Sequence, residues 1–136
     1  LIGAVVYQLS GVPTGAVAEL FASAAESKMT ASPVALLLKG ILCNTLVCMA
    51  VWCSIKLKSD SGKLIMVFWC IFTFMICGFE HSVANMTTMA VGLMNAGDAA
   101  VNVGGYIYNL FFVTVGNMIG GVLVVALPYH FIAKER

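Results

Sequence analysis

Charged side chains are scarce in this sequence of 136 residues, which has seven Lys and Arg and six Asp and Glu. Apolar residues make up 61% of the chain, and the mean hydropathy is +1.00. A water-soluble domain of this length cannot bury so large an apolar fraction. With a net charge of +1 and no basic patch interleaved with aromatic residues, the chain is not expected to bind nucleic acid. We therefore expect a membrane protein.

Motifs of secretion, metal binding and disulfide chemistry are also missing. The chain begins without a Met, a basic region or a small-residue cleavage site, so residues 1–7 are not a signal peptide. We expect them to end another membrane helix of a longer polytopic protein, of which this chain is the C-terminal part. None of the five cysteines forms a CxxC pair, which predicts reduced thiols packed as small apolar residues. We expect neither a metal site nor a cofactor.

Long apolar runs predict the membrane-spanning helices, because a spanning helix needs roughly 20 apolar residues. One such run is broken by polar residues. We predict a single all-α transmembrane domain over residues 1–136, with the end of a helix at 1–10, an outer interfacial helix at 14–29, a span at 32–57, a broken span at 63–79 and 82–95, and a last span at 104–132.

The predicted outer helix has a candidate N-cap, Thr14, and an apolar stripe at helical spacing formed by Val17, Leu20, Phe21 and Ala24. Lys28, near its end, has two interpretations. It is a solvated cation that complements the helix dipole, which the residues alone favour, or it raises the anion concentration at the mouth of a pore.

Basic residues mark one side of the membrane. They gather in the link at 56–63 and after the last span, at Lys134 and Arg136, whereas segments 11–32 and 97–98 carry mainly acids. The excess of Lys and Arg in cytoplasmic loops predicts that the link and the C-terminus are cytoplasmic.

Polar residues interrupt the broken span at membrane depth. Glu80, His81 and Ser82 follow about fifteen nearly unbroken apolar residues, and ionisable groups there cost several kcal/mol unless they face protein or a water-filled path. Irregular backbone at that depth is tolerated only where it lines a cavity. These three residues are therefore candidates for a solute pathway, against the alternative that a lone buried His is a structural residue.

Three further residues are candidates for the same pathway. Phe74 lies seven residues before His81, a spacing that places both on nearly the same helical face and makes Phe74 a candidate apolar gate. Asn44, near the middle of its span, either forms an interhelical hydrogen bond or lines a pore. Val47 lies one turn later on the same face, and on its own it would be assigned to the core.

Gly116 and Gly120 have the GxxxG spacing that lets two membrane helices approach closely, and Asn117 lies between them. Packing is the role that this weak and common motif predicts.

Three segments, in order along the chain, resemble the signatures of the formate/nitrite transporter family: residues 40–48 (GILCNTLVC), 78–86 (GFEHSVANM) and 113–121 (VTVGNMIGG). The resemblance covers the second half of a family member, from the end of its third helix to its C-terminus. It implies an aquaporin-like bundle of two inverted three-helix repeats, of which this chain supplies the second. It also implies an N-terminal half and a homopentamer with one pore in each protomer.

For individual residues, the resemblance implies that His81 is the central pore histidine and Phe74 a constriction residue. It makes Asn44 and Val47 pore-lining and Lys28 the cation of the outer vestibule. The implied protein is a multi-pass transporter of small monovalent anions in the bacterial cytoplasmic (inner) membrane, surrounded by lipid. An enzyme is not expected, because it would need a second catalytic group converging on His81.

Phe112 departs from the pattern, since many formate and nitrite members have Pro before Val-Thr-x-Gly-Asn. With this departure the chain looks more like the hydrosulfide-channel branch. We therefore expect a hydrosulfide channel, with a formate or nitrite transporter, or a proton-coupled carrier of the same anions, as the alternatives.

Overall fold

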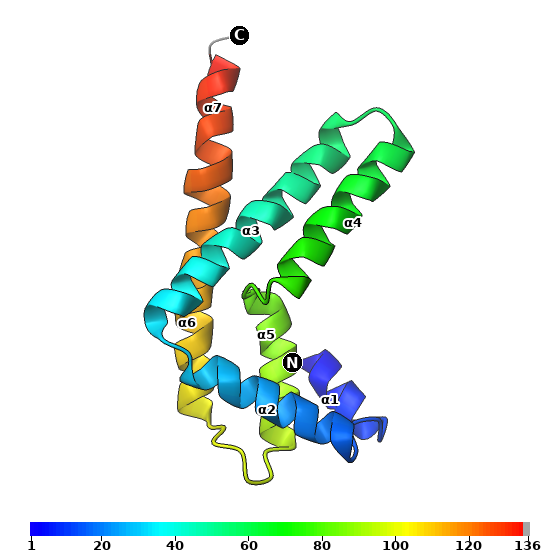
Figure 1. Cartoon of the computed structure of the whole chain (residues 1–136), viewed down its shortest axis with the longest axis vertical. Coiled ribbons are helices and arrows are strands. Elements are labelled where there is room, and N and C mark those ends of the chain that lie inside the picture. The colour runs from blue at the N-terminus through cyan, green and yellow to red at the C-terminus, as the bar shows by residue number, and fades with distance from the viewer. Residues whose placement is uncertain (135–136) are drawn as a thin grey trace. The chain divides into compact units, whose positions relative to one another are not determined.

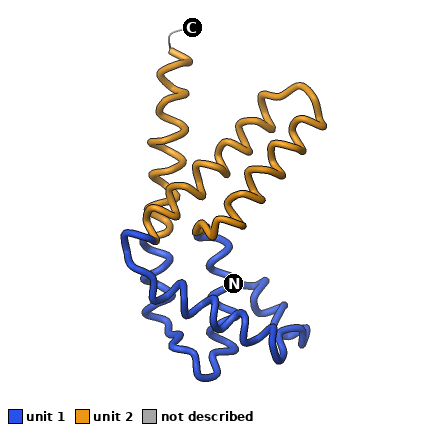
Figure 2. Tube along the Cα trace, viewed as in Figure 1, with its two compact units in different colours: residues 1–35, 82–112 blue, residues 36–81, 113–136 orange. Residues whose placement is uncertain are grey.

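A computed structural model describes residues 1–134, whose regular elements are all helical (Figure 1). In chain order these are α1 (Ile2–Leu9), α2 (Ala16–Thr30), α3 (Pro33–Lys56), α4 (Asp60–Ile76), α5 (Ser82–Met94), α6 (Val103–Ile119), the π-helix η1 (Gly120–Ala126) and α7 (Leu127–Lys134). The chain divides into two compact units (Figure 2). The first unit contains residues 1–35 and 82–112, and the second contains residues 36–81 and the chain from Val113 onward.

Among the described residues, two helical stretches are long and apolar enough to cross a membrane. These are α3, with 24 residues, and the uninterrupted helix from α6 to α7, with 32. The predicted broken span differs in its bounds. Its first piece, α4, begins at Asp60 because the Ser59 Oγ caps it by accepting a hydrogen bond from the Gly62 N–H at 3.3 Å. It ends at Ile76, so the helix break covers residues 77–81 and is wider than the sequence predicted.

In the first unit, α2 packs along α5. Gly92 allows this approach, because a Cβ at that position would lie 2.7 Å from the Phe21 carbonyl oxygen. Ala25, Met29 and Met89 form a buried cluster, covered by Leu93, Val101, Tyr106 and Leu110. This unit is thus built on close helix contact through small residues.

The apolar stripe predicted for α2 does not coincide with the face that α2 buries within its unit. Leu20 is 68% exposed, whereas the residues buried against the unit are Ala22, Ala25 and Met29. Small side chains occupy the contact face because α2 lies so close to α5. The predicted N-cap was also wrong, since Gly15 with φ +51° takes that position in place of Thr14.

In the second unit, α3 crosses the long helix at glycines on both sides. A Cβ on Gly40 would lie 2.9 Å from the Val113 carbonyl oxygen, and a Cβ on Gly116 would lie 3.2 Å from the Gly40 Cα. A Cβ on Gly120 would lie 3.0 Å from the Ile41 carbonyl carbon. The predicted packing role of Gly116 and Gly120 is confirmed, and their partner is α3 of the same chain.

Candidate functional site

The helix break at residues 77–81 begins with a C-cap that depends on glycine. Gly78 has φ +64°, in the left-handed region. Its N–H donates to the Met75 carbonyl at 3.2 Å, and the Phe79 N–H donates to the Phe74 carbonyl at 3.0 Å. These two hydrogen bonds define a Schellman motif, which satisfies the last carbonyls of α4 as the chain leaves the helix.

The backbone of the break is held by groups from two other helices. The Glu80 N–H donates to the Lys39 carbonyl of α3 at 3.4 Å, and the Glu80 carbonyl accepts from Asn117 Nδ2 of α6 at 3.0 Å. Asn117 Nδ2 also donates to the Gly40 carbonyl at 2.9 Å, and the Asn117 backbone carbonyl accepts from Asn44 Nδ2 at 2.7 Å. Irregular backbone inside a membrane requires such external partners. One network therefore joins α3, the break and α6.

Phe74 and His81 face each other across the C-cap. Their ring centroids are 6.0 Å apart with an angle of 30° between the ring planes, and Phe74 is only 7% exposed. The prediction that they share one helical face was wrong, because α4 ends at Ile76. The rings come together because the chain turns at Gly78 and brings His81 back toward the last turns of α4.

The candidates on α3 are both partly buried. Asn44 makes an interhelical hydrogen bond to α6, which was one of the two interpretations of its sequence position. Its other predicted role, in lining a pore, stays a prediction. Val47 lies three residues further along α3 on the same side, and its pore-lining role also stays a prediction.

Lys28 and Ser82 belong to the first unit. Lys28 is partly buried in the last turn of α2, and its carbonyl accepts a hydrogen bond from Asn109 Nδ2 of α6 at 2.9 Å. Asn109, which is fully buried, also accepts from Asn85 Nδ2 of α5 at 3.0 Å. The end of α2 that carries Lys28 is thus hydrogen-bonded to α6, which is in turn hydrogen-bonded to α5. Ser82 is buried and is the first residue of α5.

Two asparagines of α6 organise the structure in a way that the sequence did not predict. Asn117 was assigned to packing between the glycines, and Asn109 was not singled out. The available signal was an amide side chain inside an apolar span, because such groups must find a partner there. The partners of Asn117 and Asn109 come from other helices, so the sequence alone does not reveal them.

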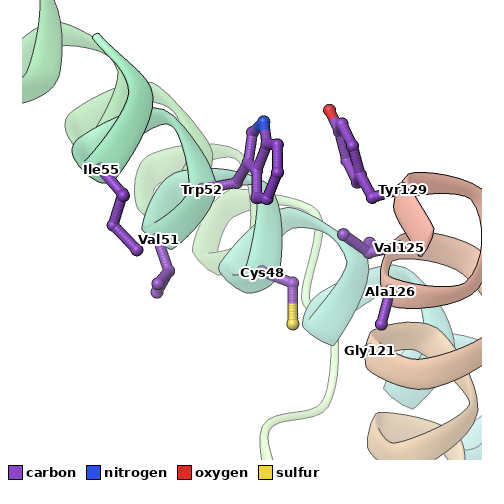
Figure 3. A pocket seen from close by; sticks show the side chains of 8 residues that line it. All are labelled: Cys48, Val51, Trp52, Ile55, Gly121, Val125, Ala126 and Tyr129. Atoms are coloured by element: carbon purple, nitrogen blue, oxygen red, sulfur yellow. The ribbon is translucent and has the colours of Figure 1, made fainter. Parts of the chain in front are cut away.

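A groove of about 380 Å³ lies in the second unit, away from the break (Figure 3). Figure 3 shows the rings of Trp52 on α3 and Tyr129 on α7 beside one another. Their centroids are 4.0 Å apart. The lining residues are mainly hydrocarbon: Cys48, Val51, Trp52, Ile55, Gly121, Val125, Ala126 and Tyr129. A lining of this kind suits apolar packing and not an anion site.

The same end of the second unit carries basic residues. Lys56 Nζ lies 5.0 Å from the centroid of the Trp52 ring, and Lys56 lines a cavity together with Ile132 and Ala133 of α7. The basic end of α3 and the C-terminal end of α7 therefore lie on the same side, as the predicted orientation requires. Arg136, part of the predicted basic C-terminus, lies outside the described residues.

The comparisons with known proteins agree on one family. The sequence profile described as Formate/nitrite transporter matches residues 1–131. The chain is 39% identical to the nitrite transporter NirC of Salmonella typhimurium over 109 aligned residues. The aligned segment covers 80% of this chain and 40% of NirC. The profile match covers nearly the whole of the sequence.

Two solved structures share the fold. A chain described as an FNT family ion channel matches with a TM-score of 0.86 and 36% identity, over 95% of this chain and 52% of that one. A pentameric formate channel with formate bound matches with a TM-score of 0.83 and 25% identity, over 97% of this chain and 60% of that one. The chain thus spans about half the length of the proteins that it matches.

The fold is accordingly the all-helical fold of a membrane channel family, as predicted. The matched proteins are transporters and channels and not enzymes, in agreement with the expectation from the sequence. This chain belongs to the formate/nitrite transporter family.

Proposed function

We propose that this chain is the C-terminal half of a membrane channel that passes small monovalent anions of weak acids. The observation that carries the proposal is the pairing of the Phe74 and His81 rings at a hydrogen-bonded helix break, in a chain of this family. Broken helices of this kind form substrate sites in membrane transporters, because their freed backbone and helix ends face the solute.

The mechanism follows from solvation. Moving a bare monovalent ion into a low-dielectric constriction costs of order 10 kcal/mol, even with partial relaxation of the surroundings. Phe74 forms the constriction and offers an anion no hydrogen-bond donor. His81 donates a hydrogen bond or a proton to the anion, since imidazole changes its charge near neutral pH. The species that passes Phe74 is then neutral or nearly so.

Other residues lower the same cost before the constriction. Lys28 gathers anions at the outer mouth through its positive charge. Ser82 begins α5 directly after His81, so the N–H groups of that first turn supply the positive end of a helix dipole. Asn44 and Val47 line the path, one with an amide and one with a methyl surface. Glu80 contributes through its backbone, which fixes the break.

We propose hydrosulfide as the principal anion, on the basis of Phe112. With Phe112, α6 continues without the kink that a proline at this position would impose. The centroid of the Phe112 ring lies 5.1 Å from that of Tyr108 and 5.2 Å from that of Phe111. Nitrite and formate are the alternatives, supported by the names of the matched proteins. A proton-coupled carrier of the same anions remains the alternative to a channel.

The proposed assembly is a homopentamer of six-helix protomers in the bacterial cytoplasmic (inner) membrane, with the C-terminus in the cytoplasm. The second unit supports the orientation, because Lys56 and the end of α7 lie together. In this arrangement α3 is the fourth span, α4 and α5 are the broken fifth, and the helix from α6 to α7 is the sixth. An N-terminal half supplies the other three-helix repeat, and α2 lies at the outer interface.

The test is anion flux into liposomes that contain the full-length protein. Hydrosulfide, formate and nitrite are compared at several pH values, with empty liposomes to measure passive leak of the neutral acids and sulfate as a divalent control. We expect flux of the monovalent anions well above the leak and no flux of sulfate. Flux equal to the leak for all three anions would overturn the proposal.

A further inference from the structure

We infer that Asn117 is a positioning residue of the pore, which holds the peptide group before His81 in place through the carbonyl of Glu80. The inference deepens the proposed function and rests on it, because the residue to be positioned is the proposed pore histidine. Asn117 itself need not touch the anion.

Asn117 is fixed by several hydrogen bonds at once. Its Nδ2 donates to the Glu80 carbonyl at 3.0 Å and to the Gly40 carbonyl at 2.9 Å. Its own backbone carbonyl accepts from Asn44 Nδ2 at 2.7 Å, and the residue is 8% exposed. Both N–H groups of the side-chain amide are therefore committed to backbone carbonyls on different segments, which prevents the side chain from rotating.

The bond to Glu80 matters because His81 is the next residue in the chain. The peptide unit between Glu80 and His81 is planar, so holding its carbonyl oxygen restricts the movement of the whole unit from which the His81 backbone continues. The other polar backbone group of Glu80, its N–H, donates to the backbone carbonyl of Lys39 on α3 at 3.4 Å. With both atoms held, His81 keeps its ring 6.0 Å from Phe74.

Helix packing does not by itself explain an asparagine here. Gly116 and Gly120 provide the close approach to α3, and a small apolar residue at position 117 would serve that approach equally well. A buried amide inside a membrane is unfavourable unless its donors are satisfied. The donors of Asn117 are satisfied by carbonyls of the break and of α3, and this arrangement points to a role in holding the break.

The experiment compares Asn117→Ala, Asn117→Asp and Asn102→Asp in the full-length protein. Ala removes both donors. Asp removes them when ionised and restores one O–H donor when protonated, which burial favours. Asn102 is the matched control, because it is an exposed cap at the other end of α6 whose Oδ1 accepts from the Gly105 N–H at 2.8 Å, and Asp caps equally well.

Each flux is divided by the amount of assembled protein and by the wild-type flux at the same pH. Glu80 and His81 on the break and Lys39 on α3 also carry ionisable groups, and Asn117→Ala, which lacks the Asp carboxyl, reports their contribution to the pH profile. We expect Asn117→Ala to reduce the flux about tenfold at every pH, which is the scale of one lost hydrogen bond. The flux of Asn117→Asp should exceed that of Asn117→Ala at pH 5 and fall toward it by pH 8, as the buried carboxyl loses its proton. The flux of Asn102→Asp should stay at the wild-type value throughout.

Hydrogen exchange supplies a readout that does not depend on transport. Peptides that cover residues 77–82 should exchange faster in Asn117→Ala than in the wild type, and at the wild-type rate in Asn102→Asp. The inference would be overturned if residues 77–82 exchanged in Asn117→Ala at the same rate as in the wild type. It would also be overturned if both Asn117 variants carried the same flux per assembled protein as the wild type. Failure of both variants to assemble would overturn it too, by assigning Asn117 to folding. If the wild type itself carries no anion, the proposed function fails, and the exchange rates alone decide whether Asn117 holds the break.

Discussion

Replacing Phe74 by Ala should raise the anion flux per assembled protein, and replacing it by Trp should lower it. Phe74 is buried and its ring faces that of His81, so the proposed path is narrowest where these rings meet. Removing the ring leaves space for at least one water molecule, whose share of liquid volume is about 30 Å³. That water can stay with the anion as it passes.

The magnitude follows from the hydrogen bond that the anion retains. A hydrogen bond to a charged group contributes about 1.5–3 kcal/mol, and about 1.4 kcal/mol corresponds to a factor of ten. Phe74→Ala should therefore raise flux by about ten- to a hundredfold, with reduced discrimination among hydrosulfide, formate and nitrite. The larger indole of Phe74→Trp should have the opposite effect.

The assay must separate gating from stability, because a buried Phe→Ala replacement costs about 3–5 kcal/mol in protein cores. Flux is therefore normalised to assembled protein measured by size-exclusion chromatography. Phe72, on the same helix but 42% exposed, supplies the matched controls Phe72→Ala and Phe72→Trp, which should leave normalised flux unchanged. Equal normalised flux for the Ala, Phe and Trp forms at position 74 would refute the gate.

Three further predictions concern the outer mouth, the helix crossing and the missing half. Lys28→Gln should raise the anion concentration for half-maximal flux, more at low salt than at high salt because the effect is electrostatic, and an unchanged concentration would contradict the role. Gly116→Val should abolish assembly because even its Cβ would press on the Gly40 Cα, whereas Gly3→Ala, with nothing within 4 Å, should assemble normally; assembly of Gly116→Val would contradict the tight crossing. This chain expressed alone should carry no flux, and co-expression with an N-terminal half should restore it; a monodisperse, flux-competent preparation of this chain alone would contradict that division.

The sequence predicted the helices well where hydropathy decides their bounds and poorly where polar contacts do. The apolar run that begins at Pro33 predicts the length of α3, because a membrane-spanning helix must be apolar along nearly its whole length. The start of α4 was placed too late, because its first turn is polar and its N-terminus is set by the capping bond of Ser59. The face that α2 buries within its unit was not identified from the sequence, because small residues, and not the largest apolar ones, fit against Gly92.

In the candidate site too, the features that depend on hydropathy were predicted and those that depend on polar contacts were not. Glu80 and His81 are recognisable from sequence, because ionisable residues inside an apolar span are costly. The proximity of Phe74 to His81 was expected for the wrong reason, since it arises from the turn at Gly78 and not from one helix face. Asn117 was missed as an organising residue because its partner in the break is 37 residues away in sequence. Tertiary hydrogen bonds of that separation leave no local pattern.

The most direct test of the account is the pH dependence of flux in His81→Phe, with His130→Phe as the matched control. His130 is exposed on α7, where its ring packs on Phe131, so its replacement should leave flux unchanged. Between about pH 5 and pH 8, where imidazole changes charge, His81→Phe should assemble normally but alter both the flux and its pH dependence. An assembled His81→Phe protein with the wild-type flux at every pH would contradict the central claim that His81 lies on the anion path.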